Sequence, residues 1–366
     1  MAFFSRKPAY ELDETIELSL PPRKISESWS LAEHTTIRTG GKARVFQVAE
    51  DIATMISVTR GCDFDGTDLL ILSGGSNTLI SDEGFPGMVM LVAAQGARAV
   101  VTYGELVLEV NAGVVLDTLI AETVKRGWRG LEMLSGIPGL VGAAPIQNIG
   151  AYGAEIATAI RNVVVYDRQA REVTVLETDQ CQFGYRTSIF KQNPDRYVIL
   201  RVDLGVGLDR NSKPVTYAEL AQALKINIGE EAPLKKVRHE VLKLRQSKGM
   251  VLDSKDHDTW SAGSFFTNPF IDDPTANALP EDAPRFDQGD GAYKTSAAWL
   301  IEHAGFPKGY GGGPATLSTK HVLALTNRGT ATTSDIITLA REIQQGVRDR
   351  FGITLSPEPT LVGVTW

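Results

Sequence analysis

The sequence predicts an α+β protein in which sheets are joined by few long helices. Three observations predict this class. Short β-rich segments recur between Arg44 and Leu176, and only a few stretches carry apolar residues at helical spacing. Glycine is abundant, with 35 among 366 residues, so the backbone makes many tight turns. A chain of this length is sufficient for two or three domains, each with its own core.

The N-terminal half alternates strands with two helices. The expected strands cover 44–48, 69–72, 88–92, 106–110, 163–166 and 173–176. Ile52, Met55 and Ile56 mark one face of a helix between the first two strands. A better defined helix has four apolar residues on one face: Leu116, Leu119, Ile120 and Val124. It ends in two basic residues and Gly127, a natural C-terminal cap.

The C-terminal half begins with a change of composition near Asp209. A polar patch with a proline follows, so a linker and domain border are expected at about 210–235. A helix is expected at 295–304, and an apolar stripe predicts another between Ser334, as N-cap, and Gly352. Residues 1–30 show no clear period and are expected to be a poorly ordered extension or an edge segment.

Charge excludes some classes of partner. The 37 Lys and Arg against 44 Asp and Glu give a net charge of −7, so no basic field favours nucleic acid. The run from Met133 to Ala154 carries no charge and exceeds the roughly 20 residues that span a bilayer. Its glycines and prolines oppose a membrane helix, and the charged N-terminus opposes a signal peptide. A cytoplasmic protein without membrane insertion is expected.

Cysteine and histidine give little support for metal or disulfide chemistry. Cys62 and Cys181 form no CxxC pair and no disulfide framework, although a single bridge between them stays possible. The five histidines have no metal-ligand spacing. No metal site is therefore expected.

The segment after the strand at 69–72 is a small-residue turn. It contains Gly74, Gly75, Ser76, Asn77 and Thr78. Such a turn can present backbone N–H groups to a phosphate. No long helix follows, so this is not a dinucleotide fingerprint of the Rossmann type. Taken alone, a plain tight turn is the more frequent interpretation.

A second glycine-rich segment runs from Gly130 to Gly153. Small side chains every few residues permit close approach of a flat ligand. Gln147 and Asn148 are either handles for the edge of a heterocycle or ordinary turn residues. Together, the two glycine segments favour a cofactor that has both a diphosphate and a ring system.

Three further residues are candidates for chemistry. Arg186 follows an aromatic residue and could grip a carboxylate or phosphate, unless it is simply solvated. Ser264 lies between Gly263 and two phenylalanines, without the surroundings of a hydrolase nucleophile. Glu358 is held between two prolines, in a rigid segment or a surface turn.

Taken together, five segments resemble the UDP-N-acetylenolpyruvoylglucosamine reductase family over roughly residues 30–366. They are SGGSN, SGIPGLVGAAPIQNIGAYGAE, CQFGYRTSIFK, AGSFFTNP and FGITLSPEP, in the family's order. The resemblance implies an FAD-binding fold of the vanillyl-alcohol-oxidase (PCMH) type in two subdomains, plus a smaller α/β substrate-binding domain. The implied regions are an extension (1–30), the FAD-binding region (31–209, first subdomain near 31–95), a linker with a tyrosine loop (210–235), the substrate-binding domain (236–350) and a C-terminal segment that returns to the active site (351–366).

The resemblance also implies the chemistry. NADPH would reduce FAD, and UDP-N-acetylglucosamine enolpyruvate would then be reduced to UDP-N-acetylmuramate for peptidoglycan. Arg186 and Glu358 would act at the substrate carboxylate, and Ser264 would donate a proton. Tyr185, Tyr217, Lys248 and Asn268 would bind substrate. The implied FAD contacts are Gly74, Gly75, Ser76, Asn77, Thr78, Gly136, Ile137, Gly139, Gly142, Ala143, Gln147, Asn148, Gly150, Ala151 and Gly153.

The sequence departs from the family pattern at Thr267, at Thr360, in the length of 249–260 and in its N-terminal extension. Two alternatives stay open: an FAD-dependent carbohydrate or alcohol oxidase, and a flavin-binding protein without turnover. Such oxidases often attach flavin through histidine, but none lies between His34 and His239, so non-covalent FAD is expected. The expected partners are small molecules, and the expected state is a monomer.

Overall fold

The computed structural model describes residues 13–18 and 29–366, which divide into two compact units. Of the described residues, unit 1 contains 13–18, 47–67 and 90–244, and unit 2 contains 29–46, 68–89 and 245–366. Neither unit is continuous in sequence. The borders expected at 209 and 235 both fall inside unit 1, because the chain passes between the units several times. The assignment of 31–209 to FAD binding and of 236–350 to substrate binding stays a prediction.

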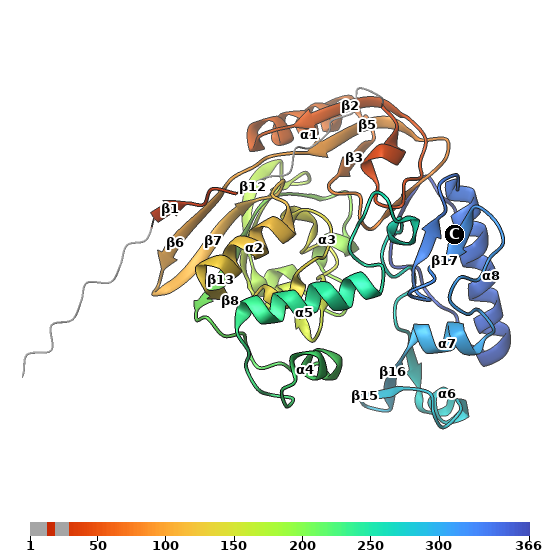
Figure 1. Cartoon of the computed structure of the whole chain (residues 1–366). Coiled ribbons are helices and arrows are strands. Elements are labelled where there is room, and N and C mark those ends of the chain that lie inside the picture. Colours follow the sequence, from red (N-terminus) through yellow and green to blue (C-terminus); the bar gives the residue numbers. More distant parts are fainter. Residues whose placement is uncertain (1–12, 19–28) are drawn as a thin grey trace, which may run out of the picture. The chain divides into compact units, whose positions relative to one another are not determined.

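The helices and strands are shown in Figure 1. Those of unit 1 are β1 (Asp13–Thr15), α1 (Ile52–Asp65), β6 (Ala97–Thr102), β7 (Glu105–Asn111), α2 (Leu116–Arg126), β8 (Trp128–Arg129), β9 (Gly150–Ala151), β10 (Ala154–Glu155), β11 (Ile160–Asp167), β12 (Glu172–Glu177), α3 (Ile189–Gln192), β13 (Tyr197–Leu208) and α4 (Ala218–Leu224). Three elements run across the border between the units: β2 (Ala43–Ala49), β5 (Phe85–Val92) and α5 (Leu234–Ser247).

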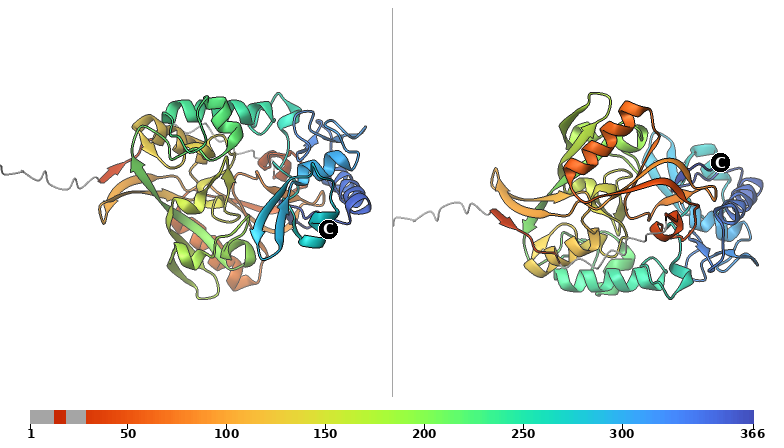
Figure 2. Two further views of the ribbon diagram at one scale, coloured as in Figure 1. Left: turned by 90° about the horizontal axis from the view of Figure 1, so that it is seen from below. Right: turned by 90° about the horizontal axis from the view of Figure 1, so that it is seen from above.

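A seven-stranded antiparallel sheet is the framework of unit 1. Its strands follow the order β1-β6-β7-β13-β11-β12, with β8 paired to the end of β13. Figure 2 shows the long hairpin of β6 and β7 from two further sides, with β1 beside it. The edge alternative for the N-terminal segment is therefore confirmed at β1, whereas residues 1–12 and 19–28 lie outside the described part.

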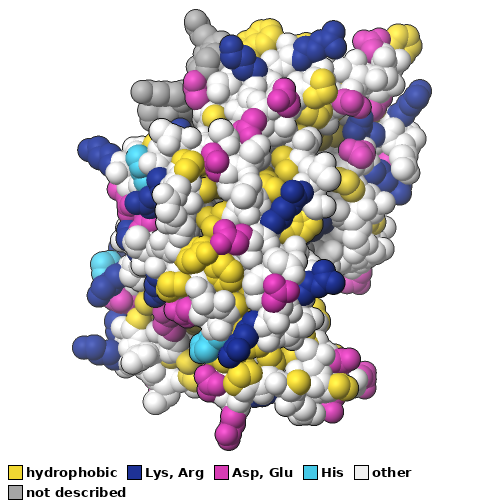
Figure 3. Space-filling model, turned by 90° about the vertical axis from the view of Figure 1, so that its right-hand side faces the viewer, with side chains coloured by type: hydrophobic (Ala, Val, Ile, Leu, Met, Phe, Trp, Pro, Cys, Tyr) yellow, Lys and Arg dark blue, Asp and Glu magenta, His cyan; other side chains and the backbone are white. Residues whose placement is uncertain are grey.

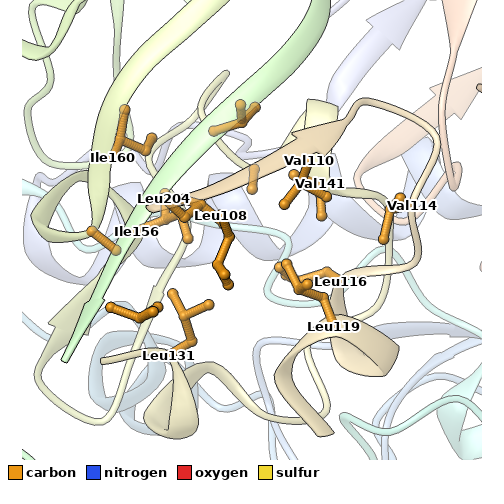
Figure 4. Packing of buried hydrophobic residues seen from close by; sticks show 14 of the residues in the cluster. Leu108, Val110, Val114, Leu116, Leu119, Leu131, Val141, Ile156, Ile160 and Leu204 are labelled. Atoms are coloured by element: carbon orange, nitrogen blue, oxygen red, sulfur yellow. The ribbon is translucent and has the colours of Figure 1, made fainter. Parts of the chain in front are cut away.

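The core of unit 1 forms where one face of this sheet meets α2. Leu108 on β7, Leu204 on β13 and Leu119 on α2 are all fully buried in one cluster, which Figure 4 shows from close by. The helix presents one apolar face because its apolar residues follow a 3.6-residue period. Its end at Gly127, with φ of +76°, confirms the predicted cap.

The segment that composition predicts as a linker is folded. The N–H of Ser212 donates to the carbonyl of Ala232 at 2.8 Å, and that of Val215 donates to Glu230 at 2.9 Å. Val215 is fully buried with residues of α4 and α5. The polar and proline residues of this segment form a compact loop of unit 1, because their backbone groups hydrogen-bond to each other.

The other helices and strands belong to unit 2. They are β3 (Leu69–Leu72), β4 (Thr78–Ile80), β14 (Phe270–Asp272), α6 (Asp273–Ala278), β15 (Arg285–Gly289), β16 (Ala292–Thr295), α7 (Ala297–His303), β17 (Ala315–Leu317), β18 (Leu325–Asn327), α8 (Thr333–Phe351) and β19 (Thr360–Val362).

The long helix α8 corrects one sequence-based prediction. The N-cap is Thr332, not Ser334, because the Thr332 and Asp335 side chains accept hydrogen bonds from each other's backbone N–H groups. Ser334 lies in the first turn, where its N–H donates to Asp82 at 2.9 Å. The predicted end at Gly352 is confirmed by its φ of +70°.

Within 13–18 and 29–366 no helix is long and apolar enough to cross a membrane, and no cluster of three metal-ligating side chains occurs. Cys62 and Cys181 are both buried free thiols, so they form no bridge. On the face that Figure 3 shows, Lys and Arg are interspersed with acidic and hydrophobic side chains, without a broad basic patch.

Asp167 at the end of β11 gives unit 1 a pH-dependent contact. Its carboxylate accepts hydrogen bonds from Arg196 at 2.7 Å and from the N–H of Gln169 at 2.9 Å. The Arg196 guanidinium lowers the pKa of Asp167 below its ordinary value. The resulting stabilisation is present above the ordinary Asp pKa of about 4 and is lost as pH falls toward the lower folded-state pKa.

We therefore expect Asp167→Asn to lower the midpoint of thermal unfolding by about 2–6 °C at pH 7. The difference from the unmodified protein should shrink progressively below about pH 4, because the unfolded chain is protonated at Asp167 first and the folded protein only near its lower pKa. Calorimetry over a pH series measures this. A difference that stays constant down to pH 3 would contradict the ionic origin of the stabilisation.

Candidate active site

The first glycine turn lies in unit 2, between β3 and β4. Gly75 has φ of +60°, and a Cβ built on it would lie 2.0 Å from the carbonyl oxygen of His34. Only glycine fits this buried position. Among the described residues, the N–H groups of Gly74 and Gly75 meet no hydrogen-bond acceptor. The turn therefore presents two unused backbone donors, as an anion-binding turn requires.

Glu358 lies directly beside this turn. Strand β19 pairs in parallel with β4, and the amide of Asn77 donates to the carbonyl of Glu358 at 3.3 Å. The N–H of Glu358 donates in turn to the carbonyl of Phe265 at 2.8 Å. The C-terminal segment thus links the turn to the residues that follow Ser264, because its backbone bonds to both.

Ser264 is held by neighbours that leave its hydroxyl unused. Phe265 and Phe266 are each 1% exposed, and Gly263 before the serine has φ of +77°. The Ser264 hydroxyl makes no hydrogen bond to another described residue. A half-buried hydroxyl next to two buried rings is available to a ligand that reaches it.

The loop between Lys248 and Ser264 is held in place by a buried carboxylate. Asp258 is 5% exposed and bonds the guanidinium of Arg328 at 2.7 Å and the hydroxyl of Thr319. Burial acts to raise the pKa of Asp258, but the bonds from Thr319 and the charge of Arg328 outweigh it, so the net shift is downward. The loop whose length departs from the family pattern is therefore anchored at Asp258.

Arg186 belongs to unit 1, where it holds the second glycine segment. Its two Nη atoms donate to the carbonyls of Asn148 at 3.2 Å and Gly150 at 2.9 Å. Its Cζ lies 5.7 Å from the ring centroid of Tyr185. The backbone of Arg186 is left-handed, with φ of +54°, a rare conformation for a residue with a side chain. Arg186 is therefore fixed by the segment that is predicted to bind FAD.

The second glycine segment is shaped for close approach at some positions and for internal packing at others. Gly139 has φ of +119°, and its N–H meets no acceptor among the described residues. A Cβ on Gly142 would lie 2.5 Å from the Cβ of Ala112, so packing within unit 1 already accounts for that glycine. Gly136 donates its N–H to Asp117 at 2.7 Å. Gly139 is therefore the better candidate for a ligand contact.

Asn148 behaves as a turn residue. Its side-chain amide donates to Glu155 at 2.8 Å and to the carbonyl of Gly184 at 3.1 Å, and it accepts from the N–H of Ala157 at 3.1 Å. The residue is 1% exposed. These internal bonds agree with the interpretation of Asn148 as a turn residue, and its contact with FAD stays a prediction.

Tyr217 packs against the end of the same segment. Its ring lies 5.5 Å from that of Tyr152 at 88°, and it precedes α4 with 43% of its surface exposed. A Cβ on Gly153 would lie 2.6 Å from the hydroxyl of Thr216. The tyrosine predicted to cover substrate is therefore positioned by the glycine segment, with one face open to solvent.

The structure sorts the predicted site residues by unit. Unit 2 brings together the turn at 74–78, Ser264 and Glu358, and it also contains Lys248 and Asn268. The Asn268 side-chain oxygen accepts from the N–H of Ala297 at 3.0 Å, where α7 begins, so that oxygen is occupied. Unit 1 brings together Arg186, Tyr185, Tyr217 and the segment 136–153. The individual binding roles stay predictions.

Two residues of unit 2 were not predicted from sequence: Arg38 and Trp260. The Cζ of Arg38 lies 5.6 Å from the ring centroid of Trp260. The signal available was a lone charge in the otherwise uncharged run from Thr35 to Gly41. It was weak because a single arginine is most often solvated.

Comparisons with known proteins give the class and then the family. An FAD-binding domain matches residues 43–169, and the C-terminal domain of UDP-N-acetylenolpyruvoylglucosamine reductase matches residues 254–362. The chain is 50% identical to the reductase of that name from Cutibacterium acnes, over 93% of this chain and 90% of the relative. It is 47% identical to the one from Streptomyces coelicolor, over 95% and 94%.

A solved structure agrees with these matches. The reductase from Thermus caldophilus superposes with a TM-score of 0.63 at 25% identity, covering 96% of this chain and 100% of that chain. The protein is a flavin-dependent oxidoreductase with a mixed α+β FAD-binding fold. It belongs to the UDP-N-acetylenolpyruvoylglucosamine reductase family, whose members act in peptidoglycan synthesis.

Proposed function

We propose that the chain reduces UDP-N-acetylenolpyruvoylglucosamine to UDP-N-acetylmuramate with NADPH, through non-covalent FAD. The observation that carries this proposal is the near-full-length similarity to reductases of that name. Supporting it, Arg186, Ser264 and Glu358 are all present, which a flavin-binding protein without turnover has no need to keep. We further propose that the protein acts as a monomer on small molecules in the cytoplasm.

The residues fit FAD as a ligand. Its diphosphate is rich in hydrogen-bond acceptors, and the N–H groups of Gly74, Gly75 and Gly139 have no acceptor among the described residues. The bound cofactor would accept a hydride from NADPH and deliver it to the enolpyruvyl double bond.

Arg186 is proposed to bind the substrate carboxylate. When a hydride adds to one alkene carbon, negative charge develops on the other and is shared with the carboxylate. A guanidinium held in place by the carbonyls of Asn148 and Gly150 stabilises that charge without having to reorganise. The left-handed backbone of Arg186 supports this role, since strained residues of this kind often occur at functional sites.

Ser264 is proposed to donate the proton that completes the reduction. The proton moves from its hydroxyl oxygen to the carbon that carries the developing charge, and solvent later restores it to the serine. A serine is a weak acid, but this carbon is a strong base, so a positioned hydroxyl suffices. Glu358 is also proposed to act at the substrate carboxylate, and its backbone is fixed to Phe265 next to the serine.

We expect the purified full chain to be yellow and to release all of its FAD on acid precipitation. No histidine stands between His34 and His239 to attach the flavin covalently, and the two cysteines are buried. Absorbance of the supernatant at the flavin maximum measures the released fraction. Flavin that stays in the pellet, or a folded colourless chain that FAD cannot reconstitute, would contradict the prediction.

The experiment that tests the function separates the two half-reactions. The protein is mixed with NADPH under nitrogen until its flavin absorbance is bleached, and then with UDP-N-acetylenolpyruvoylglucosamine. Rapid return of the absorbance without oxygen supports the reductase. Return only when oxygen is admitted would support an oxidase, and an absence of bleaching by NADPH would support a non-catalytic binding protein.

A further inference from the structure

Arg38 in unit 2 is an arginine in a left-handed conformation. Its φ is +60°, which side chains rarely adopt. Its backbone is held by Asn327, whose amide donates to the carbonyls of Ile37 and Arg38, each at 3.1 Å. Glycine would fit this position without strain, so the arginine is present for its side chain.

The guanidinium of Arg38 has an aromatic neighbour and, within residues 13–18 and 29–366, no hydrogen-bond acceptor. Its Cζ lies 5.6 Å from the ring centroid of Trp260, and the indole also contacts the ring of His257 at 4.1 Å. The Nε atom of Arg38 and the Nε1 atom of Trp260 are both buried, without a hydrogen-bond partner among the described residues. No carboxylate there pairs with Arg38. Buried donors are costly to leave unmet, and arginine keeps its charge.

The segments that carry Arg38 and Trp260 are hydrogen-bonded to each other and to the first glycine turn. The N–H of Thr36 donates to the carbonyl of Gly75 at 3.0 Å, and its hydroxyl donates to the carbonyl of Ser261 at 2.7 Å. Arg38 lies two residues after Thr36, and Trp260 lies directly before Ser261. A guanidinium, an indole N–H and the unused N–H groups of the turn are therefore contributed by neighbouring backbone.

We propose that Arg38 and Trp260 form a phosphate subsite of unit 2. The guanidinium binds phosphate oxygens as a charged donor, and the indole N–H donates to the same group. A neutral ligand would leave the guanidinium charge unmatched, and a single carboxylate would satisfy fewer donors than a phosphate. FAD, UDP and NADPH all offer this chemistry, and the inference rests on the proposed function only for this choice of ligands.

A purely structural role is the competing explanation. In that case the stacking of Arg38 on Trp260 would stabilise unit 2, and the two buried N–H groups would stay unmet. The two explanations differ for Arg38→Gly, which relieves the left-handed strain and removes the charge. A phosphate subsite predicts unchanged or higher stability with weaker binding, whereas a structural role predicts lower stability with unchanged binding.

The test measures binding by the full chain. FAD and riboflavin are titrated into flavin-free protein and followed by flavin fluorescence, and UDP and NADPH are titrated into the FAD-loaded protein by calorimetry. We expect Arg38→Gln and Arg38→Gly to weaken one of FAD, UDP and NADPH by about 10- to 100-fold, the loss of a charged hydrogen-bond donor. The ligand affected identifies the source of the phosphate. Trp260→Phe keeps the ring, and we expect it to weaken the same ligand by about 2- to 10-fold.

The controls decide between the explanations. Arg44→Gln removes an exposed charge of the same unit and should leave all affinities unchanged. Riboflavin lacks phosphate and should bind every variant alike. Equal binding of FAD, UDP and NADPH by both Arg38 variants and the unmodified chain would overturn the inference.

A phosphate probe separates this inference from the proposed function. Inorganic diphosphate should raise the unfolding midpoint of the flavin-free chain and leave that of Arg38→Gln unchanged. This result supports the subsite even if UDP-N-acetylenolpyruvoylglucosamine is not reduced. An equal rise in both proteins would overturn the subsite while leaving the reductase function intact.

Discussion

Replacing Ser264 by alanine is expected to leave bleaching of the flavin by NADPH nearly unchanged and to slow its return with UDP-N-acetylenolpyruvoylglucosamine by about 10²- to 10⁴-fold. The first half-reaction requires no proton from this serine, whereas the second depends on protonation of the alkene carbon. Stopped-flow absorbance resolves the two rates in one protein preparation. The unfolding midpoint should not change by more than about 2 °C, because no other described residue bonds the hydroxyl.

A neighbouring serine provides the matched control. Ser356 is exposed, and only its carbonyl bonds Thr267, so alanine retains that contact. Ser356→Ala should behave as the unmodified protein in both half-reactions. Equal slowing of both half-reactions in Ser264→Ala would contradict the role as proton donor and indicate a disturbed flavin site.

Replacing Arg186 by glutamine is expected to slow the second half-reaction by about 10²- to 10³-fold, because the developing charge loses its cation. The shorter glutamine side chain does not make both hydrogen bonds to the carbonyls of Asn148 and Gly150. The glycine segment is then held less firmly, so flavin affinity should also fall. Arg186→Lys keeps the charge but not the two-armed geometry, and should restore only part of the rate. Single-turnover kinetics measure the rate, and flavin fluorescence measures the affinity.

Arg171 gives a control with similar backbone. It is an exposed arginine of unit 1 with φ of +58°, and Arg171→Gln changes the same charge at a position that is also left-handed. We expect normal rates and normal flavin binding. If Arg186→Gln retained the rate of the second half-reaction while losing only flavin affinity, the arginine would be a positioning residue of the glycine segment and not a ligand of the carboxylate.

Local signals in the sequence predicted the elements well. The strand at Leu69–Leu72 has the expected bounds, and the caps at Gly127 and Gly352 adopt the left-handed conformation expected of them. These features depend on neighbouring residues alone. The predicted N-cap of α8 is wrong by two positions. Threonine and serine both suit an N-cap, and the reciprocal hydrogen bonds between Thr332 and Asp335 decide between them.

Long-range packing was not predictable in the same way. Asn148 reads as a polar handle, yet Glu155, Ala157 and Gly184 occupy its amide. At Gly142 the close approach of Ala112 is a second reason for a glycine, which the sequence does not show, and the predicted cofactor contact stays a prediction. Composition likewise indicated a linker where the backbone pairs with itself. A turn residue and a ligand contact have the same sequence signature, so only the partner atoms distinguish them.

The sequence by itself determined the family, the FAD-binding fold and the three residues to which chemistry is assigned. Ordered motifs over most of the chain carry that information, and local propensity sets the elements. Only the tertiary structure decided that the chain divides into two discontinuous units and that Glu358 bonds beside the turn at Gly75. It also revealed that the guanidinium of Arg38 lies over Trp260 and that its buried Nε atom has no hydrogen-bond partner among the described residues. The reason is physical: hydrogen-bond satisfaction and burial depend on residues distant in sequence, which no local pattern specifies.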